Sequence, residues 1–246
     1  MQIKSRGIVL SETPYNDRFS IVRVLTPSEG IVAYKVPFPA GRRSLAHTLR
    51  RVLYPMSEVQ FVAEHRKGRS VQRMIEASPA PLRYQILMQP EKRNISLFLA
   101  DLLRLMLQKQ TDEPMFDFVS NALEHLEAIE TSIGIANYPI AFLRALLDFI
   151  GIAPNYTPLD VAEGVWFSIE EADFIPFSRS ASDINPQEAP FIPTLLRINY
   201  RNMHLYRFTG AQRRHILAAM LDFIRFHWIA FPALKSTDVL TELYER

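Results

Sequence analysis

Basic side chains are concentrated near the start of the chain, where they could bind an anion. Residues 1–79 hold thirteen lysines and arginines but only six acidic residues, a net charge of +7, whereas the whole 246-residue chain carries +2. A phosphate backbone is attracted to such a region, because binding releases the counterions condensed on nucleic acid. The alternative is an ordinary solvated basic surface, and charge alone leaves both interpretations open.

Two adjacent arginines, Arg42 and Arg43, are the first candidates for contacts with phosphate groups. They follow Gly41, and we expect them on an exposed loop, because buried guanidinium groups need partners. Arg50 and Arg51 rank second together with the basic residues of the turn at 66–69, since this turn could face away from a binding groove. The other basic candidates of the region, including those of this turn, are Lys35, Arg50, Arg51, Arg66, Lys67 and Arg69.

Aromatic residues are interleaved with these basic ones and could stack on bases. One such stack is worth about 1–3 kcal/mol in proteins that bind single strands. Small barrels also fill their interiors with rings, so we expect Phe19 and Phe61 in a core. Tyr34, Phe38 and Tyr54 neighbour basic residues in the sequence, and we expect these three to be the stacking residues.

Signatures of catalysis and of metal binding are missing from the sequence. The absence of cysteine excludes disulfides, a thiol nucleophile and thiolate zinc ligands. The two closest glycines, Gly30 and Gly41, are eleven positions apart, too far for a phosphate-binding glycine loop. The six histidines lack metal-ligand spacing, and no nucleophile elbow is present. We therefore expect a protein that is not an enzyme and that uses no cofactor or metal.

Short strand-like runs with turn signals between them predict the architecture of the basic region. Residues 26–30 read as a hairpin connection in which Gly30 can adopt positive φ. A longer connection separates the third run from the fourth. The five runs cover residues 8–10, 19–25, 31–36, 57–64 and 70–77. This pattern fits a small closed barrel, and an OB-fold, whose groove binds single strands, is the obvious candidate.

Prolines at positions 79 and 81 mark the clearest domain boundary, and the periodicity after them is helical. We expect an α+β multidomain protein: a five-stranded OB-fold barrel over residues 1–79, then an all-α helical domain over residues 80–246. Helices are predicted over residues 90–108, 111–129 and 137–150, near 195–198, and over 209–232 and 237–244. The helix from 209 should open with a capping box and bury Leu217, Met220, Leu221, Ile224 and Trp228.

The first 79 residues resemble the N-terminal domain of RecO, the bacterial recombination mediator. The similarity rests on a GIVL-like opening strand (residues 7–10), a tyrosine-containing turn (15–17), a strand ending at Thr26, the glycine turn at Gly30 and the Gly/Arg-rich loop of residues 41–44. Residues 76–79 resemble the end of the family's barrel, and Lys235-Ser236 its closing segment. Each motif is weak by itself, but their order along the chain is specific.

The resemblance implies a DNA-binding recombination mediator in DNA repair. Such a protein would bind single- and double-stranded DNA, anneal complementary strands and act with RecR to load RecA onto strands coated by single-strand-binding protein. The alternative is a protein-interaction scaffold whose basic barrel binds an acidic protein partner. No apolar run is long enough to span a membrane and no secretory signal precedes the first strand, so we expect a cytoplasmic, nucleoid-associated protein without a membrane partner.

RecO relatives bind the acidic, apolar-ended tail of single-strand-binding protein on the helical domain. Such a tail needs an apolar pocket with basic residues at its rim. The basic cluster in the second half of the chain comprises Arg197, Arg201, Arg207, Arg213 and Arg214. We place the tail site near this cluster, at Arg197, Arg201 and Arg207.

Many RecO proteins carry a four-cysteine zinc module inside the helical domain, at the place of residues 155–193 here. This segment has neither cysteine nor histidine, and its carboxylates match no calcium loop. We expect an irregular, metal-free insertion or a short hairpin. Its contacts should come from Trp166 and the aromatic residues near it, Phe167, Phe174 and Phe177.

Overall fold

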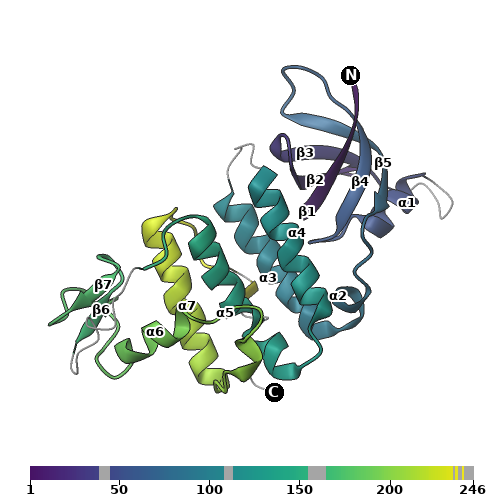
Figure 1. Cartoon of the computed structure of the whole chain (residues 1–246). Helices are drawn as coiled ribbons and strands as arrows, with labels where there is room; N and C mark the ends of the chain where they lie inside the picture. The colour runs from purple at the N-terminus through teal and green to yellow at the C-terminus, as the bar shows by residue number, and fades with distance from the viewer. Residues whose placement is uncertain (39–44, 108–112, 155–164, 235, 238–239, 241–246) are drawn as a thin grey trace. The chain divides into compact units, whose positions relative to one another are not determined.

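The computed structural model describes residues 1–38, 45–107, 113–154, 165–234, 236–237 and 240 (Figure 1). Through their contacts, these residues form two compact units. The first unit contains Met1–Ile129 and Leu234–Leu240, and the second contains Glu130–Ala233. None of the described helices is both long and apolar enough to cross a membrane.

The first unit begins with a closed five-stranded barrel, as the sequence predicts. Its order is β1-β2-β3-β5-β4, in which β3 and β5 pair in parallel and all other neighbours are antiparallel. The strands are β1 (Gln2–Asn16), β2 (Phe19–Thr26), β3 (Gly30–Pro37), β4 (Glu58–Glu64) and β5 (Val71–Pro79). A helix, α1 (Leu45–Val52), lies between β3 and β4 in the chain. This is the strand order of an OB-fold.

The barrel closes around side chains that alternate along each strand, because successive residues of a strand face opposite sides. Val22 and Val24 of β2 and Val59 and Phe61 of β4 are buried in this core. The positive φ predicted for Gly30 is present, at 63°. Gly7 is required for close packing, since a Cβ there would overlap with Val24 Cγ1. The glycine of the opening strand motif thus serves the barrel interior.

Three helices complete the first unit: α2 (Tyr84–Met88), α3 (Pro90–Met106) and α4 (Glu113–Ala128). The predicted stripe of α4 is confirmed at Val119, Leu123 and Leu126, all fully buried. The helices α3 and α4 contact strand β1, so part of the helical region packs on the barrel within one unit. Helix α2 was missed from the sequence because its five residues are too few for helical periodicity. The predicted boundary after residue 79, where β5 ends, stays a prediction.

The second unit is built on two long helices, α5 (Ser132–Phe149) and α7 (Gly210–His227). The predicted capping box of α7 is confirmed: Thr209 Oγ1 accepts from Gln212 N at 3.2 Å, and Gln212 Oε1 accepts from Thr209 N at 2.8 Å. Shorter elements between the helices are β6 (Trp166–Ser168), β7 (Asp173–Ile175), η1 (Ala189–Phe191), α6 (Ile192–Leu195) and η2 (Met203–Leu205).

Three helix predictions for this unit need correction. Helix α5 starts at Ser132, capped by Thr131, and contains Pro139, because the buried apolar face compensates for one missing N–H donor. The short helix near 195–198 is Ile192–Leu195 instead. Of the residues expected to be buried in α7, Met220 is half-buried and Trp228, at the end of the helix, is 44% exposed, whereas Phe223 is buried. Most of the helix predicted over 237–244 lies outside the described residues.

The expected short hairpin in the 155–193 segment is present, formed by β6 and β7. Phe167 is its buried anchor and lies edge-to-face against Phe174, with ring centroids 5.2 Å apart. Trp166 is half-buried and Phe177 is 62% exposed, so Trp166 and Phe177 are not the main anchors. His227 Nε2 lies 2.6 Å from the Ile169 carbonyl oxygen and ties the hairpin turn to the end of α7.

Candidate nucleic-acid interface

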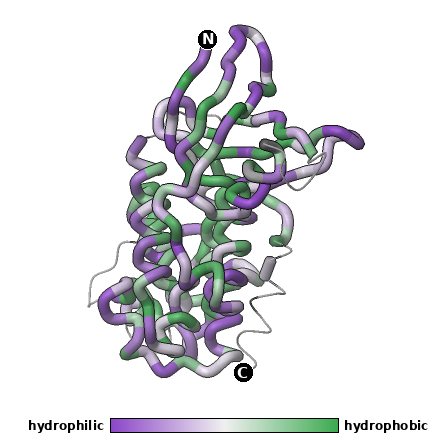
Figure 2. The backbone as a smooth tube through the Cα atoms, turned by 90° about the vertical axis from the view of Figure 1, so that its right-hand side faces the viewer, coloured by the Kyte–Doolittle hydropathy of each residue, from purple (hydrophilic) through white to green (hydrophobic). Residues whose placement is uncertain are grey.

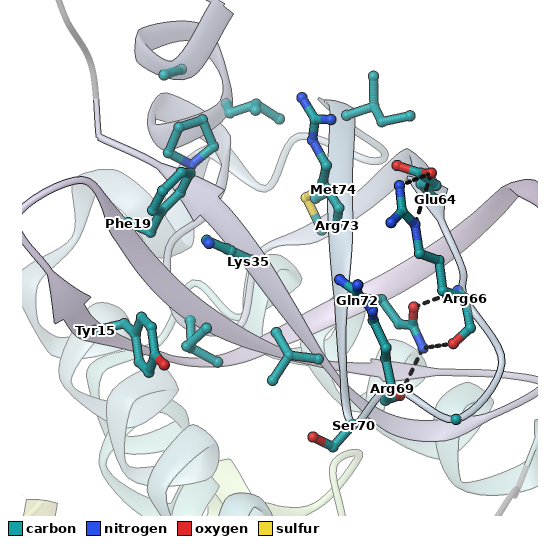
Figure 3. Close-up of a pocket in the computed structure, with 17 residues that line it drawn as sticks. Tyr15, Phe19, Lys35, Glu64, Arg66, Arg69, Ser70, Gln72, Arg73 and Met74 are labelled. Carbon is teal, nitrogen blue, oxygen red and sulfur yellow. Dashed lines mark hydrogen bonds and ion pairs between the residues drawn. The ribbon is translucent and has the colours of Figure 1, made fainter.

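A groove with a cavity volume of about 830 Å³ lies along β2, β3 and β5 and reaches α1 at Ala46 and Leu49 (Figure 3). One end is formed by Tyr15 near the end of β1, and the other by the β4–β5 loop, residues 65–70. In OB-folds, the β2–β3 face and the loops β1–β2 and β4–β5 form the surface that binds oligonucleotides. The groove therefore lies at the position where this fold binds its ligands.

Cations from two strands and one loop line the groove. Lys35 on β3 and Arg73 on β5 are register partners in the parallel pair, so their Cα atoms lie side by side. Arg66 and Arg69 come from the β4–β5 loop. Among the described residues of the lining, Glu64 is the one acidic residue, and together they carry a net charge of +3. The Arg66 guanidinium donates to Glu64 Oε1 at 2.9 Å and 3.1 Å and lowers the pKa of that carboxyl.

The rest of the groove wall is aromatic and apolar. Tyr15 is 66% exposed. Phe19 is half-buried, and Lys35 Nζ lies 3.7 Å from the centroid of its ring. Ile21 and Pro37 also line this wall. A strand of nucleic acid could place bases against such a wall while its phosphates meet the cations, which is how sequence-independent single-strand sites work.

Three predicted basic residues, Lys35, Arg66 and Arg69, line the groove, so the turn of residues 66–69 does not face away from it. Lys67 and Arg51 are exposed but are not among the lining residues. Arg50 forms an ion pair with Glu12 and lies over the ring of Phe38, with Cζ 4.2 Å from the centroid. Arg42 and Arg43, the first candidates, lie outside the described residues.

None of the three predicted stacking residues lines the groove; Tyr34 needs correction, whereas Phe38 and Tyr54 stay predictions. Tyr34 is fully buried in the barrel, where its hydroxyl lies 3.0 Å from His65 Nε2, and burial raises the pKa of this phenol. The ring of Phe38 is covered by Arg50. Tyr54 is half-buried, and burial raises its pKa as well. Phe61 is in the core as expected, whereas Phe19 is on the groove wall.

Sequence reasoning missed Tyr15 and Arg73 as groove residues. The signal for Arg73 was available in the alternation of β5, whereas Tyr15 lies in the exposed end of β1, residues 12–16, where burial does not alternate. Met74 is buried, so its neighbour Arg73 on β5 has to point outward. The same rule puts Phe19 and Ile21 outside, since Ser20 and Val22 are buried.

A second cavity, of about 700 Å³, lies within the second unit between α5, the hairpin, α6 and α7. Its walls are mainly apolar, with Ile192, Leu195 and Phe208 on one part and Ile216 and Phe223 of α7 on another. Two arginines, Arg144 and Arg207, are among the lining residues.

The residues predicted for the partner site are only partly at this cavity. Arg207 lines it, but Arg197 and Arg201 are exposed and do not. Arg213 donates from Nε to Asn137 Oδ1 at 2.7 Å, so its guanidinium is bonded within the second unit. Arg144 donates from Nε to the Leu196 carbonyl oxygen at 2.8 Å, so its position in the wall is fixed.

The barrel region and the helical region of the chain both match known protein families. Residues 1–82 match the family model "Recombination protein O N terminal", and residues 92–237 match "Recombination protein O C terminal". The DNA repair protein RecO of Porphyromonas gingivalis is 32% identical over 247 residues, with all of both chains covered. Those of Phocaeicola vulgatus and Bacteroides fragilis are 33% and 32% identical, and at least 98% of each chain is covered.

Proposed function

Because the chain belongs to the RecO family of DNA repair proteins, we propose that it is a recombination mediator that binds DNA through the barrel groove. The observation that carries this proposal is the lining of the groove. It combines four cations with the rings of Tyr15 and Phe19 on the face that OB-folds use for oligonucleotides.

The proposed activity needs positioned charge and no catalytic residue. Two complementary strands repel each other, and a basic surface that neutralises phosphates on both lowers this repulsion, so that pairing can proceed. We propose that the protein binds single- and double-stranded DNA in this way and anneals complementary strands. By its family, it would act with RecR to load RecA in the nucleoid during recombinational repair.

The test is a binding isotherm with a labelled oligothymidine of about 20 nucleotides, longer than the roughly 4–16 nucleotides that an OB-fold covers. The isotherm is repeated between about 50 and 200 mM salt. We expect micromolar or better affinity that falls steeply with salt. The groove variant Lys35→Ala/Arg69→Ala/Arg73→Ala should make the salt slope shallower by up to about two units, since each lost phosphate contact removes about 0.7 on single strands.

A matched control removes the same charge from elsewhere. Arg93, Arg197 and Arg201 are exposed, and none of them lines the groove. Their combined replacement by alanine should leave the slope within error of the wild type. If both triple variants change the slope equally, binding is a property of net charge and not of the groove. If the wild type binds no DNA at low salt but binds an acidic protein, the scaffold alternative holds.

A second proposed site concerns a protein partner and rests on the apolar cavity of the second unit. Its apolar walls and the arginine Arg207 suit an acidic peptide that ends in apolar residues, such as the tail of single-strand-binding protein. In a fluorescence titration with such a peptide, Arg207→Glu should weaken binding more than Arg197→Glu/Arg201→Glu. If the double variant has the larger effect, the peptide binds along the exposed arginines and not in the cavity.

A further inference from the structure

One side chain, Gln72 of β5, holds the backbone of the β4–β5 loop (Figure 3). Its Oε1 accepts from Arg66 N at 2.8 Å. Its Nε2 donates to the Arg69 carbonyl oxygen at 2.9 Å and to the Arg66 carbonyl oxygen at 3.3 Å. The amide group is thus bonded to both ends of the turn that contains Arg66 and Arg69.

The turn is also closed on itself and anchored at its base. Arg69 N donates to the Arg66 carbonyl oxygen at 3.2 Å, and Gly68 has a φ of 80°. At the base, His65 lies against the Tyr34 hydroxyl inside the barrel, while Gln72 binds the turn from the neighbouring strand. A loop of hydrophilic residues, drawn purple in Figure 2, is therefore fixed to the barrel at several points.

The two loop arginines differ in what fixes their side chains. Arg66 is bonded to Glu64. Within the described part of the chain, the guanidinium of Arg69 has no hydrogen bond or ion pair, and Arg69 is exposed. The direction in which Arg69 enters the groove is therefore set by the backbone at residues 66–69, and this backbone is held by Gln72.

We propose that Gln72 is a positioning residue for DNA binding: it holds the β4–β5 loop so that Arg69 faces the phosphate backbone before DNA arrives. The proposal rests on the proposed function of the groove. A loop that is ordered in advance does not have to be ordered on binding, which removes part of the entropy cost of association. Gln72 carries no charge and releases no counterion, so its contribution differs in kind from that of the arginines.

The test is the variant Gln72→Met, which keeps the length of the side chain but loses its three hydrogen bonds. The control is Gln60→Met on the neighbouring strand β4, because the Gln60 side chain is exposed and makes no hydrogen bond to the described residues. We expect Gln72→Met to weaken oligothymidine binding by about five- to tenfold through lost preorganisation. The salt slope should stay at the wild-type value, and amide exchange at Arg66 and Arg69 should accelerate. Gln60→Met should do none of this.

Several results would overturn the positioning role. Wild-type affinity in Gln72→Met would do so, as would unchanged amide exchange in the loop. An affinity loss accompanied by a shallower salt slope would mean that cation contacts, and not loop order, have been lost. A fall in the unfolding temperature beyond that of the control would point to a general structural role. A wild-type chain that binds no DNA would overturn the proposed function and, with it, this inference.

Discussion

Arginines in two parts of the first unit differ in exposure and in bonding. In the groove, Arg69 and Arg73 are exposed and available to a ligand. Next to α4, Arg83 is buried: its Nη2 donates to Glu58 Oε2 at 2.9 Å and to the Ser120 carbonyl oxygen at 3.2 Å. The Ser120 hydroxyl donates to the same carboxylate oxygen at 2.7 Å. A basic residue counted in the sequence is therefore available to a ligand only where the fold has not buried it against a partner.

Arg50 lies between these two extremes. Its side chain is 27% exposed, bonds to Glu12 and to the Ser20 hydroxyl, and covers the ring of Phe38. A net charge of +7 in the first 79 residues therefore overstates the charge that is free to bind DNA. Three substitutions, taken from the largest expected effect to the smallest, test whether each residue stabilises the fold or is free to bind DNA.

The largest effect is expected at the buried pair. Glu58→Ala would leave the Arg83 guanidinium buried without its carboxylate, and breaking such a pair costs about 3–5 kcal/mol of the free energy of unfolding. Urea unfolding followed by far-ultraviolet circular dichroism measures it, because both tryptophans, Trp166 and Trp228, lie in the second unit. The double variant Glu58→Leu/Arg83→Met should recover most of this loss, because both charges are gone. A loss below 1 kcal/mol for Glu58→Ala would mean that Arg83 is not dependent on this partner.

An intermediate effect is expected at Arg50. Arg50→Ala removes a half-exposed pair and the cover of Phe38, which should cost about 1 kcal/mol of the free energy of unfolding. Affinity for DNA should stay within twofold of the wild type, since Arg50 is engaged with Glu12. If DNA affinity falls while the free energy of unfolding does not, Arg50 contacts DNA as the groove arginines do, and its assignment to the fold is wrong.

The smallest effect on stability is expected at the exposed pair of Glu64 and Arg66. The pKa of Glu64 is lowered in the folded chain, first by its bond to Arg66. A lowered carboxyl pKa gives stability that is present above the pKa of the unfolded chain and is lost as the pH falls through the folded value. Because the pair is exposed, Arg66→Ala should raise the Glu64 pKa in a carbon-13 NMR titration without shifting the urea midpoint at pH 7. An unchanged titration would mean that the two side chains are not bonded in solution.

The barrel could be predicted from the sequence because its signals are local. Strand alternation, the glycine at position 30 and the proline exit of β5 indicate the elements, and four observed strands follow them closely. The first strand was predicted over residues 8–10 only, whereas β1 extends over Gln2–Asn16. Helix α7 was predictable for the same reason, through the capping box at Thr209. Elements without a local signal, such as the five-residue α2, were missed.

The groove was predicted only in part, because it depends on which side of each strand a residue faces. Lys35, Arg66 and Arg69 were found by charge and position in the chain. Tyr34 was misplaced because it neighbours Lys35 in the sequence, although adjacent residues of a strand face opposite sides, which puts Tyr34 in the core. The pairing of Lys35 with Arg73 across β3 and β5 is a long-range contact, and no sequence pattern indicates it.

The central claim is that DNA is bound by the exposed groove arginines and not by those engaged in the fold. The most direct measurement is the salt dependence of oligothymidine binding for Arg69→Ala/Arg73→Ala beside that for Arg50→Ala. Two lost phosphate contacts should make the slope of the double variant shallower by about 1.4 units, at about 0.7 each, while Arg50→Ala keeps the wild-type slope. A wild-type slope in the double variant, or an equal change per arginine in both, would contradict the account.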